Sequence, residues 1–133
     1  MIEKLKKIIK QAGEEVLSSY NESVHKNNEE FPITKADIAS HSLITSHLNN
    51  FDNEEIGVFS EEDKDKFKNN TYKKFFLIDP LDGTKDFVHK TDDFAVMISL
   101  VENGYPSMGV VYKPVSEELY YASRGKGAYL ETK

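Results

Sequence analysis

The chain of 133 residues contains no cysteine and no tryptophan. Without cysteine, disulfides and thiolate ligands are excluded, so a metal site in this chain must use oxygen or imidazole donors. Long apolar runs are missing too, since the longest, residues 94–101, is far shorter than a membrane span. Residues 1–7 are charged throughout and lack the apolar core of a secretory signal. We therefore expect a cytoplasmic protein without a membrane span, and peripheral association with a membrane stays open.

Basic residues are fewer than acidic residues in this chain. The chain has 17 lysines and arginines against 23 acidic residues, a formal net charge of -6, and no long basic run. This balance argues against a nucleic-acid polymer as partner, because such proteins carry basic patches. An acidic protein that binds an anion needs a local source of positive charge, and metal ions commonly provide it. The 38% hydrophobic and 30% charged residues are typical of one globular domain of this length.

The hydrophobic pattern predicts an α+β fold, with two N-terminal helices packed on a mostly antiparallel sheet. Apolar residues recur at helical spacing over residues 2–20, and a second helix is predicted from Ala36. A strand is predicted over residues 56–59, followed by a charged surface loop up to Lys74. Further strands are predicted at five apolar runs separated mostly by turn residues: 75–78, 94–101, 108–112, 119–122 and 128–130.

The stretch "DPLDGTKDF", residues 79–87, ends one of these predicted strands with two carboxylates, Asp79 and Asp82. Pro80 favours the end of the strand in a turn, Gly83 permits close backbone approach, and Thr84 can open a helix with free N–H groups. Carboxylates attract a hard cation and free N–H groups attract a phosphate, which together suit phosphoester hydrolysis. The alternative is a plain Asp-Gly turn whose acids cap the backbone.

Three further acids raise the same question. Glu61 and Glu62 follow the strand predicted at 56–59, and Asp37 stands at the beginning of the second predicted helix. Taken singly, the glutamates fit a solvated loop and Asp37 fits a helix cap or first-turn acid. Each acid lies at the start or end of a regular element, and this joint placement favours a shared site.

At these residues the sequence resembles the inositol monophosphatase superfamily of metal-dependent, lithium-sensitive phosphatases. "DPLDGTKDF" matches the family motif D-P-[IL]-D-G-T, "SEED" at 60–63 matches its glutamate motif, and "PITKADIASHSLI" at 32–44 resembles its T-x-x-D segment. Within the superfamily, Asp82 to Phe87 and the stretch from Phe94 through Tyr129 are most similar to 3'(2'),5'-bisphosphate nucleotidases of CysQ type.

The resemblance implies specific roles. Magnesium ligands would be Glu61, Asp79, Asp82 and the carbonyl of Leu81, with Glu62 facing solvent or supporting a ligand. Asp37 and the Thr84 hydroxyl would orient and deprotonate the attacking water. Substrate contacts would come from Glu61, Leu81, Asp82, Gly83 and Thr84, with the N–H groups of Gly83 and Thr84 holding phosphate oxygens. Two or three Mg²⁺ ions are implied; Li⁺ is expected to inhibit, and Ca²⁺ to substitute in binding.

The resemblance also implies a domain arrangement and an activity. Residues 1–133 would form the metal-binding N-terminal domain of the sugar phosphatase fold, and the family's C-terminal domain, with its W-D-x-x-A motif, would be absent. The implied reaction converts adenosine 3',5'-bisphosphate to AMP, with this chain weakly active or inactive alone. Alternatives are an inositol, histidinol or fructose-bisphosphate phosphatase of the same superfamily, or a non-catalytic metal-binding fragment. Self-association through the face left by the missing domain is a further expectation.

Overall fold

The first helix of the computed structural model, α1 (Ile2–Glu22), buries one face completely. The structure describes residues 1–22, 35–49, 51–53, 55–60 and 63–133. Leu5, Ile9, Ala12 and Val16 are fully buried, and their spacing of three or four residues places them on one side of the helix. The helix predicted over residues 2–20 is therefore confirmed.

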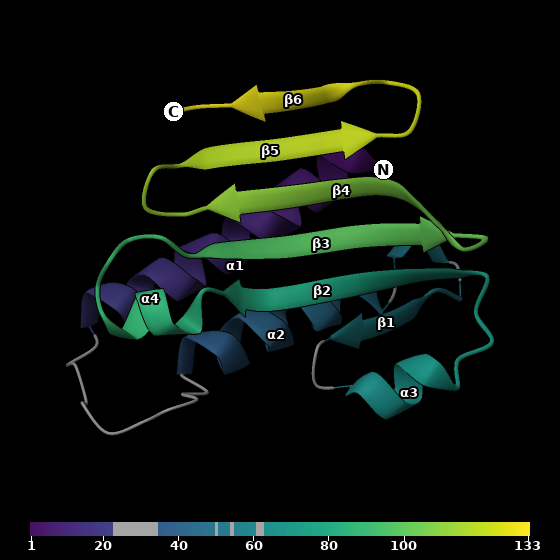
Figure 1. The fold of residues 1–133 in the computed structure, drawn as a ribbon, viewed down its shortest axis with the longest axis horizontal. Coiled ribbons are helices and arrows are strands. Elements are labelled where there is room, and N and C mark those ends of the chain that lie inside the picture. Colours follow the sequence, from purple (N-terminus) through teal and green to yellow (C-terminus); the bar gives the residue numbers. More distant parts are fainter. Residues whose placement is uncertain (23–34, 50, 54, 61–62) are drawn as a thin grey trace.

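The second helix, α2 (Lys35–Leu48), begins one residue before the predicted start at Ala36. Its buried residues Ala36, Ser40, Ile44 and Leu48 recur every four positions. This face packs against α1 and against the second strand of the sheet. The two N-terminal helices thus form one layer, which lies behind the sheet in Figure 1.

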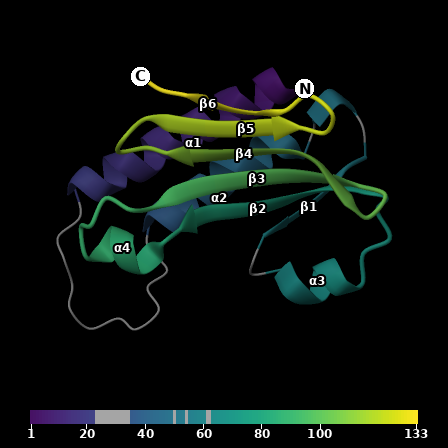
Figure 2. The same ribbon diagram turned by 45° about the horizontal axis from the view of Figure 1, so that its top comes forward.

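The other layer is a six-stranded sheet whose strands lie side by side in chain order. Its members are β1 (Gly57–Ser60), β2 (Lys74–Asp82), β3 (Ala95–Glu102), β4 (Tyr105–Lys113), β5 (Glu118–Ser123) and β6 (Ala128–Glu131). Strand β1 pairs parallel to β2, and every other neighbouring pair is antiparallel. The predicted α+β architecture with a mostly antiparallel sheet is confirmed, and Figure 2 shows both helices on one face.

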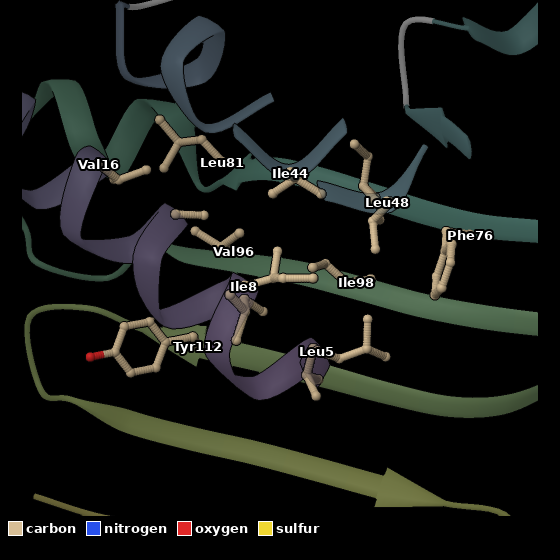
Figure 3. Close-up of a cluster of buried hydrophobic side chains, with 14 of the residues drawn as sticks. Leu5, Ile8, Val16, Ile44, Leu48, Phe76, Leu81, Val96, Ile98 and Tyr112 are labelled. Carbon is tan, nitrogen blue, oxygen red and sulfur yellow. The ribbon is translucent and has the colours of Figure 1, made fainter. Parts of the chain in front are cut away.

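The core fills the space between the two layers. Strand residues such as Phe76, Val96 and Ile98 meet helix residues such as Leu5 and Ile44, and all are almost inaccessible to solvent (Figure 3). Burial of this apolar surface is the main stabilising contribution to the fold.

A short helix, α3 (Lys64–Lys68), lies in the segment predicted as a charged surface loop, so that prediction is wrong for these five residues. Phe67 on this helix packs edge to face against Phe59 and Phe75, with ring centroids 6.0 and 5.6 Å apart. Tyr72 also packs on Phe59, at 6.0 Å. This aromatic cluster explains why so short and charged a helix is stable.

The sheet ends at β6, which carries the exposed apolar side chains Tyr129 and Leu130. Tyr120 on the neighbouring β5 is also exposed. The expected self-association through the face left by the missing domain stays a prediction. Within the described residues, no helix combines the length and the hydropathy that crossing a bilayer requires.

Candidate metal centre

Asp79 and Asp82 share one face of the sheet because β2 is irregular between them. Asp79 pairs with Met97 and Asp82 pairs with Ala95, so four residues of β2 oppose three of β3. Regular alternation would place residues three apart on opposite faces, whereas this bulge returns both acids to the face away from α1 and α2. Asp79 is half-buried and Asp82 is exposed. The strand predicted at 75–78 is longer in the structure, where β2 continues through Pro80 to Asp82, so the prediction that it ends in a turn at Pro80 is wrong.

Leu81, between the two acids, anchors this segment in the core. Its side chain is 3% exposed and belongs to the same buried cluster as Val16 and Ile44, all labelled in Figure 3. The Thr84 hydroxyl donates a hydrogen bond to the Leu81 carbonyl oxygen over 3.3 Å. A carbonyl oxygen has two lone pairs, so this bond leaves Leu81 able to accept a second interaction.

Gly83 begins the short helix α4 (Thr84–Val88) in a left-handed backbone conformation, with φ 86° and ψ 42°. Its carbonyl accepts the N–H of Phe87 over 2.9 Å. A Cβ atom at this position would lie 2.8 Å from the carbonyl oxygen of Asp93 and 3.3 Å from the Cα of Phe94. The predicted close approach of backbone to Gly83 is therefore present, as is the predicted helix that starts at Thr84.

Asp37 lies in the first turn of α2 and is half-buried. In Figures 1 and 2, this end of α2 lies beside α4 and the end of β2. The beginning of α2 thus lies beside the segment that carries Asp82 and Thr84. That Asp37 shares a site with these residues stays a prediction.

The predicted ligand Glu61 and its neighbour Glu62 lie outside the described residues. The residues on either side of them are described. Ser60, the last residue of β1, pairs with Ile78, which immediately precedes Asp79. The Asp63 carboxylate accepts hydrogen bonds from the Ser60 N–H and hydroxyl over 3.1 and 3.2 Å.

The described donors suit a hard divalent cation because all of them are oxygen atoms. They comprise the Asp79 and Asp82 carboxylates on one sheet face and the Leu81 carbonyl between them. Within the part of the chain that the structure describes, no three His, Asp or Glu side chains group closely enough to hold a metal alone. The described residues therefore fit part of a coordination shell.

Sequence reasoning does not reveal the wall behind Gly83, which is formed by the Asp93 carbonyl and the Phe94 backbone. Lys90, in the same loop, donates a hydrogen bond to the Tyr20 carbonyl on α1. Burial, followed by a hydrogen bond with Asp92, raises the pKa of Tyr20 above its ordinary value of 10.0. No local pattern reveals this contact, because Tyr20 and Asp92 are 72 positions apart.

Comparison with known proteins provides an independent line of evidence. The model of the Inositol monophosphatase family matches residues 1–133. The 3'(2'),5'-bisphosphate nucleotidase CysQ of Salmonella typhimurium is 36% identical over 131 residues, which cover 95% of this chain and 53% of that protein. The chain thus spans about half the length of the curated relatives it matches.

Solved structures show the same likeness. The crystal structure of CysQ from Bacteroides thetaiotaomicron matches with a TM-score of 0.79 and 36% identity, over 95% of this chain and 46% of that one. The structure of 2'AMP-bound SaIMPase-II matches with a TM-score of 0.77 and 27% identity, over 95% of this chain and 45% of that one. Both neighbours share the arrangement of helices and sheet described above.

Proposed function

The chain belongs to the inositol monophosphatase family, and from this premise we propose that it binds magnesium and positions a phosphomonoester for hydrolysis. The observation that carries the proposal is the bulge in β2. It sets Asp79 and Asp82 on one sheet face, directly before the turn at Gly83. Two carboxylates on one sheet face offer oxygen donors of the kind that a hard divalent cation prefers.

In this proposal, Asp79, Asp82 and the Leu81 carbonyl hold magnesium together with Glu61, and two or three ions are bound. Magnesium supplies positive charge to the phosphate and lowers the pKa of a water molecule. The half-buried Asp79 and the core-anchored Leu81 provide a fixed side of the site, whereas Asp82 is open to solvent. Donors that are held in place before the cation arrives need little rearrangement when it binds.

Asp37 and the Thr84 hydroxyl orient and deprotonate the attacking water in this proposal. Support comes from the placement of the α2 start beside α4, and from the Thr84 hydrogen bond to Leu81, which fixes the hydroxyl. The backbone N–H groups of Gly83 and Thr84 hold phosphate oxygens. No residue of this set forms a covalent bond to phosphate.

The proposed substrate is adenosine 3',5'-bisphosphate, with AMP and phosphate as products. The likeness to CysQ nucleotidases over 95% of the chain supports this choice. A second candidate is an inositol phosphate or another sugar or histidinol phosphate. The structural neighbour SaIMPase-II, solved with inositol monophosphate and with 2'AMP, supports keeping both classes open.

Phosphate release tests the proposal. The purified chain and its Asp79→Asn variant are incubated with adenosine 3',5'-bisphosphate, 2'AMP, inositol monophosphate and histidinol phosphate, in millimolar Mg²⁺ or in EDTA. Any release by the 133 residues is expected to be slow, to depend on Mg²⁺, to be fastest with the bisphosphate and to be lost in the variant. Preference for another substrate would assign the second candidate. Equal release in EDTA would overturn the metal-dependent mechanism.

The isolated chain is proposed to turn over slowly or not at all, because it spans about half of its relatives. A non-catalytic metal-binding module is therefore the remaining alternative. Binding of Mg²⁺ without phosphate release would support that alternative. Measurable release by the 133 residues alone would rule it out.

A further inference from the structure

Tyr20, near the C-terminal end of α1, is tied to the loop after α4 through both its side chain and its backbone. Its hydroxyl donates to the Asp92 carboxylate and accepts the Asp92 N–H over 3.2 Å. Its carbonyl accepts the Lys90 ammonium, which also lies 4.0 Å above the Tyr20 ring. The hydroxyl keeps its proton well into the alkaline range, because burial and then Asp92 raise the Tyr20 pKa.

The two residues held by Tyr20 are both in left-handed backbone conformations. Lys90 has φ 61° and Asp92 has φ 70°, and neither is glycine. Such conformations are unfavourable for a residue with a Cβ and persist where surrounding contacts enforce them. Tyr20 supplies those contacts for both residues.

The held loop is in turn packed against the turn that carries Asp82 and Thr84. The Asp93 carbonyl and the Phe94 backbone form the wall against which Gly83 lies. Phe94 and Phe87 both pack on the Tyr20 ring, with centroids 4.7 and 5.1 Å away. A continuous set of contacts therefore runs from α1 through the loop to Gly83.

The loop is also tied to α4 itself. The Thr91 hydroxyl donates to the Asp86 carboxylate over 2.8 Å, and the Thr91 N–H donates to the Asp86 carbonyl over 3.0 Å. The loop therefore contacts Gly83 and also α4, which begins directly after Gly83. A displacement of the loop would move the turn at Gly83 together with the start of α4.

We propose that Tyr20 is a positioning residue for the proposed magnesium site: by holding Lys90 and Asp92, it fixes the loop that sets Asp82, Gly83 and Thr84 in place. This inference rests on the proposed function for the ligand role of Asp82. Tyr20 itself touches neither the metal nor the substrate; it acts through residues 90–94.

The decisive comparison is Tyr20→Phe against Tyr112→Phe. The first variant keeps the aromatic ring and removes the hydroxyl that bonds to Asp92. Tyr112 is a matched control, since it is 8% exposed against 7% for Tyr20 and lies on β4, two strands away from β2. The measured quantity is amide hydrogen exchange at Phe87, whose N–H reports the turn through its bond to Gly83.

We expect Tyr20→Phe to raise the Phe87 exchange rate about tenfold. A change of this size corresponds to the loss of one charge-assisted hydrogen bond. Amides of β3 and β4 should keep their rates. Tyr112→Phe should leave Phe87 unchanged. A uniform rise at all amides in Tyr20→Phe, or an unchanged Phe87, would overturn the inference.

A second measurement addresses the site itself. Mg²⁺ titration by calorimetry should give a dissociation constant raised about fivefold to tenfold in Tyr20→Phe. In an Asp92→Gly background, where glycine adopts the left-handed conformation freely, the same substitution should have little further effect. Additive effects of the two changes would contradict action through Asp92.

Different results would contradict the proposed function and the positioning role of Tyr20. A wild-type chain that binds no Mg²⁺ would overturn the proposed function, and the exchange rate of Phe87 would still decide whether Tyr20 holds the turn. Wild-type Mg²⁺ binding that Tyr20→Phe and Tyr112→Phe leave equally unchanged would overturn the positioning role and leave the proposed function standing.

Discussion

The hydroxyl of Thr84 donates a hydrogen bond to the carbonyl oxygen of Leu81, with 3.3 Å between the two oxygen atoms. This bond closes the turn through Asp82 and Gly83 and joins the first residue of α4 to the last buried residue of β2. It therefore couples the proposed water-orienting hydroxyl to a proposed metal-ligating carbonyl, both anchored on the core through Leu81.

Replacing Thr84 by valine should destabilise the chain by about 1 kcal/mol, because the side-chain shape is kept and only the hydroxyl bond to Leu81 is lost. Thr84→Ser retains the hydroxyl and serves as the control. Urea unfolding followed by circular dichroism measures both. Equal free energies of unfolding for the two variants would show that the bond contributes nothing.

Magnesium should stabilise the wild-type chain against heat, since a ligand that binds only the folded state adds about 2.7 kcal/mol at one hundred times its dissociation constant. Asp82→Asn should abolish this Mg²⁺-dependent rise in melting temperature. It should not lower the melting temperature in EDTA, because a repulsive neighbour of Asp79 is removed.

The control for this experiment is Asp65→Asn, which changes an exposed acid on α3 and should keep the full Mg²⁺ response. Calcium should give a response of the same sign. Identical melting temperatures of the wild-type chain in EDTA and in millimolar Mg²⁺ would contradict a metal site at Asp79 and Asp82.

Much of the fold follows from local periodicity, and the departures have physical causes. The repeat of Leu5, Ile9, Ala12 and Val16 predicts α1, and the Asn103-Gly104 turn predicts the hairpin between β3 and β4. Local periodicity does not predict helix α3, because an isolated segment of five mostly charged residues does not form a stable helix. Its stability comes from Phe67 packing on aromatic residues of β1 and β2.

The candidate site, too, is predicted from the sequence only in part. The motif predicts two acids, a close approach at Gly83 and a helix from Thr84. It does not predict the bulge, because Pro80 indicates a strand end, whereas the irregular register lets β2 continue through it to Asp82. The loop wall behind Gly83 depends on Tyr20, Lys90 and Asp92. Contacts between positions 70 or more apart leave no trace in a local pattern.

The backbone of Gly83 makes a further substitution informative. Gly83→Ala should destabilise the chain by about 2 kcal/mol or more, because alanine is strained at φ 86° and its Cβ would meet the Asp93 carbonyl at 2.8 Å. Gly104→Ala measures the cost of the backbone conformation alone, because Gly104 has φ 85° and no atom lies within 4 Å of its Cβ position. Equal losses in the two variants, measured by urea unfolding, would show that the contact with Asp93 is unimportant.

The pair Lys6 and Glu131 links α1 to β6 and should make stability depend on pH. The hydrogen bond between the two side chains raises the pKa of Lys6 above 10.5 and lowers the pKa of Glu131 below 4.5. A lowered acid pKa stabilises the fold above pH 4.5, and this contribution is lost as the pH falls through the folded value. A raised lysine pKa stabilises the fold below pH 10.5, and this contribution is lost as the pH rises through the folded value.

Glu131→Gln should therefore be less stable than the wild-type chain at pH 7, by about 1 kcal/mol or less because solvent screens the partly exposed carboxylate. The difference should vanish once the pH falls below the lowered pKa of Glu131, where the wild-type side chain is protonated. Glu3→Gln is the matched control: Glu3 also contacts Lys6, at 3.2 Å, but its side chain is 75% exposed against 37% for Glu131. Urea unfolding between pH 3 and 8 measures both variants, and a Glu131→Gln effect that stays constant over this range would contradict the ion pair as its source.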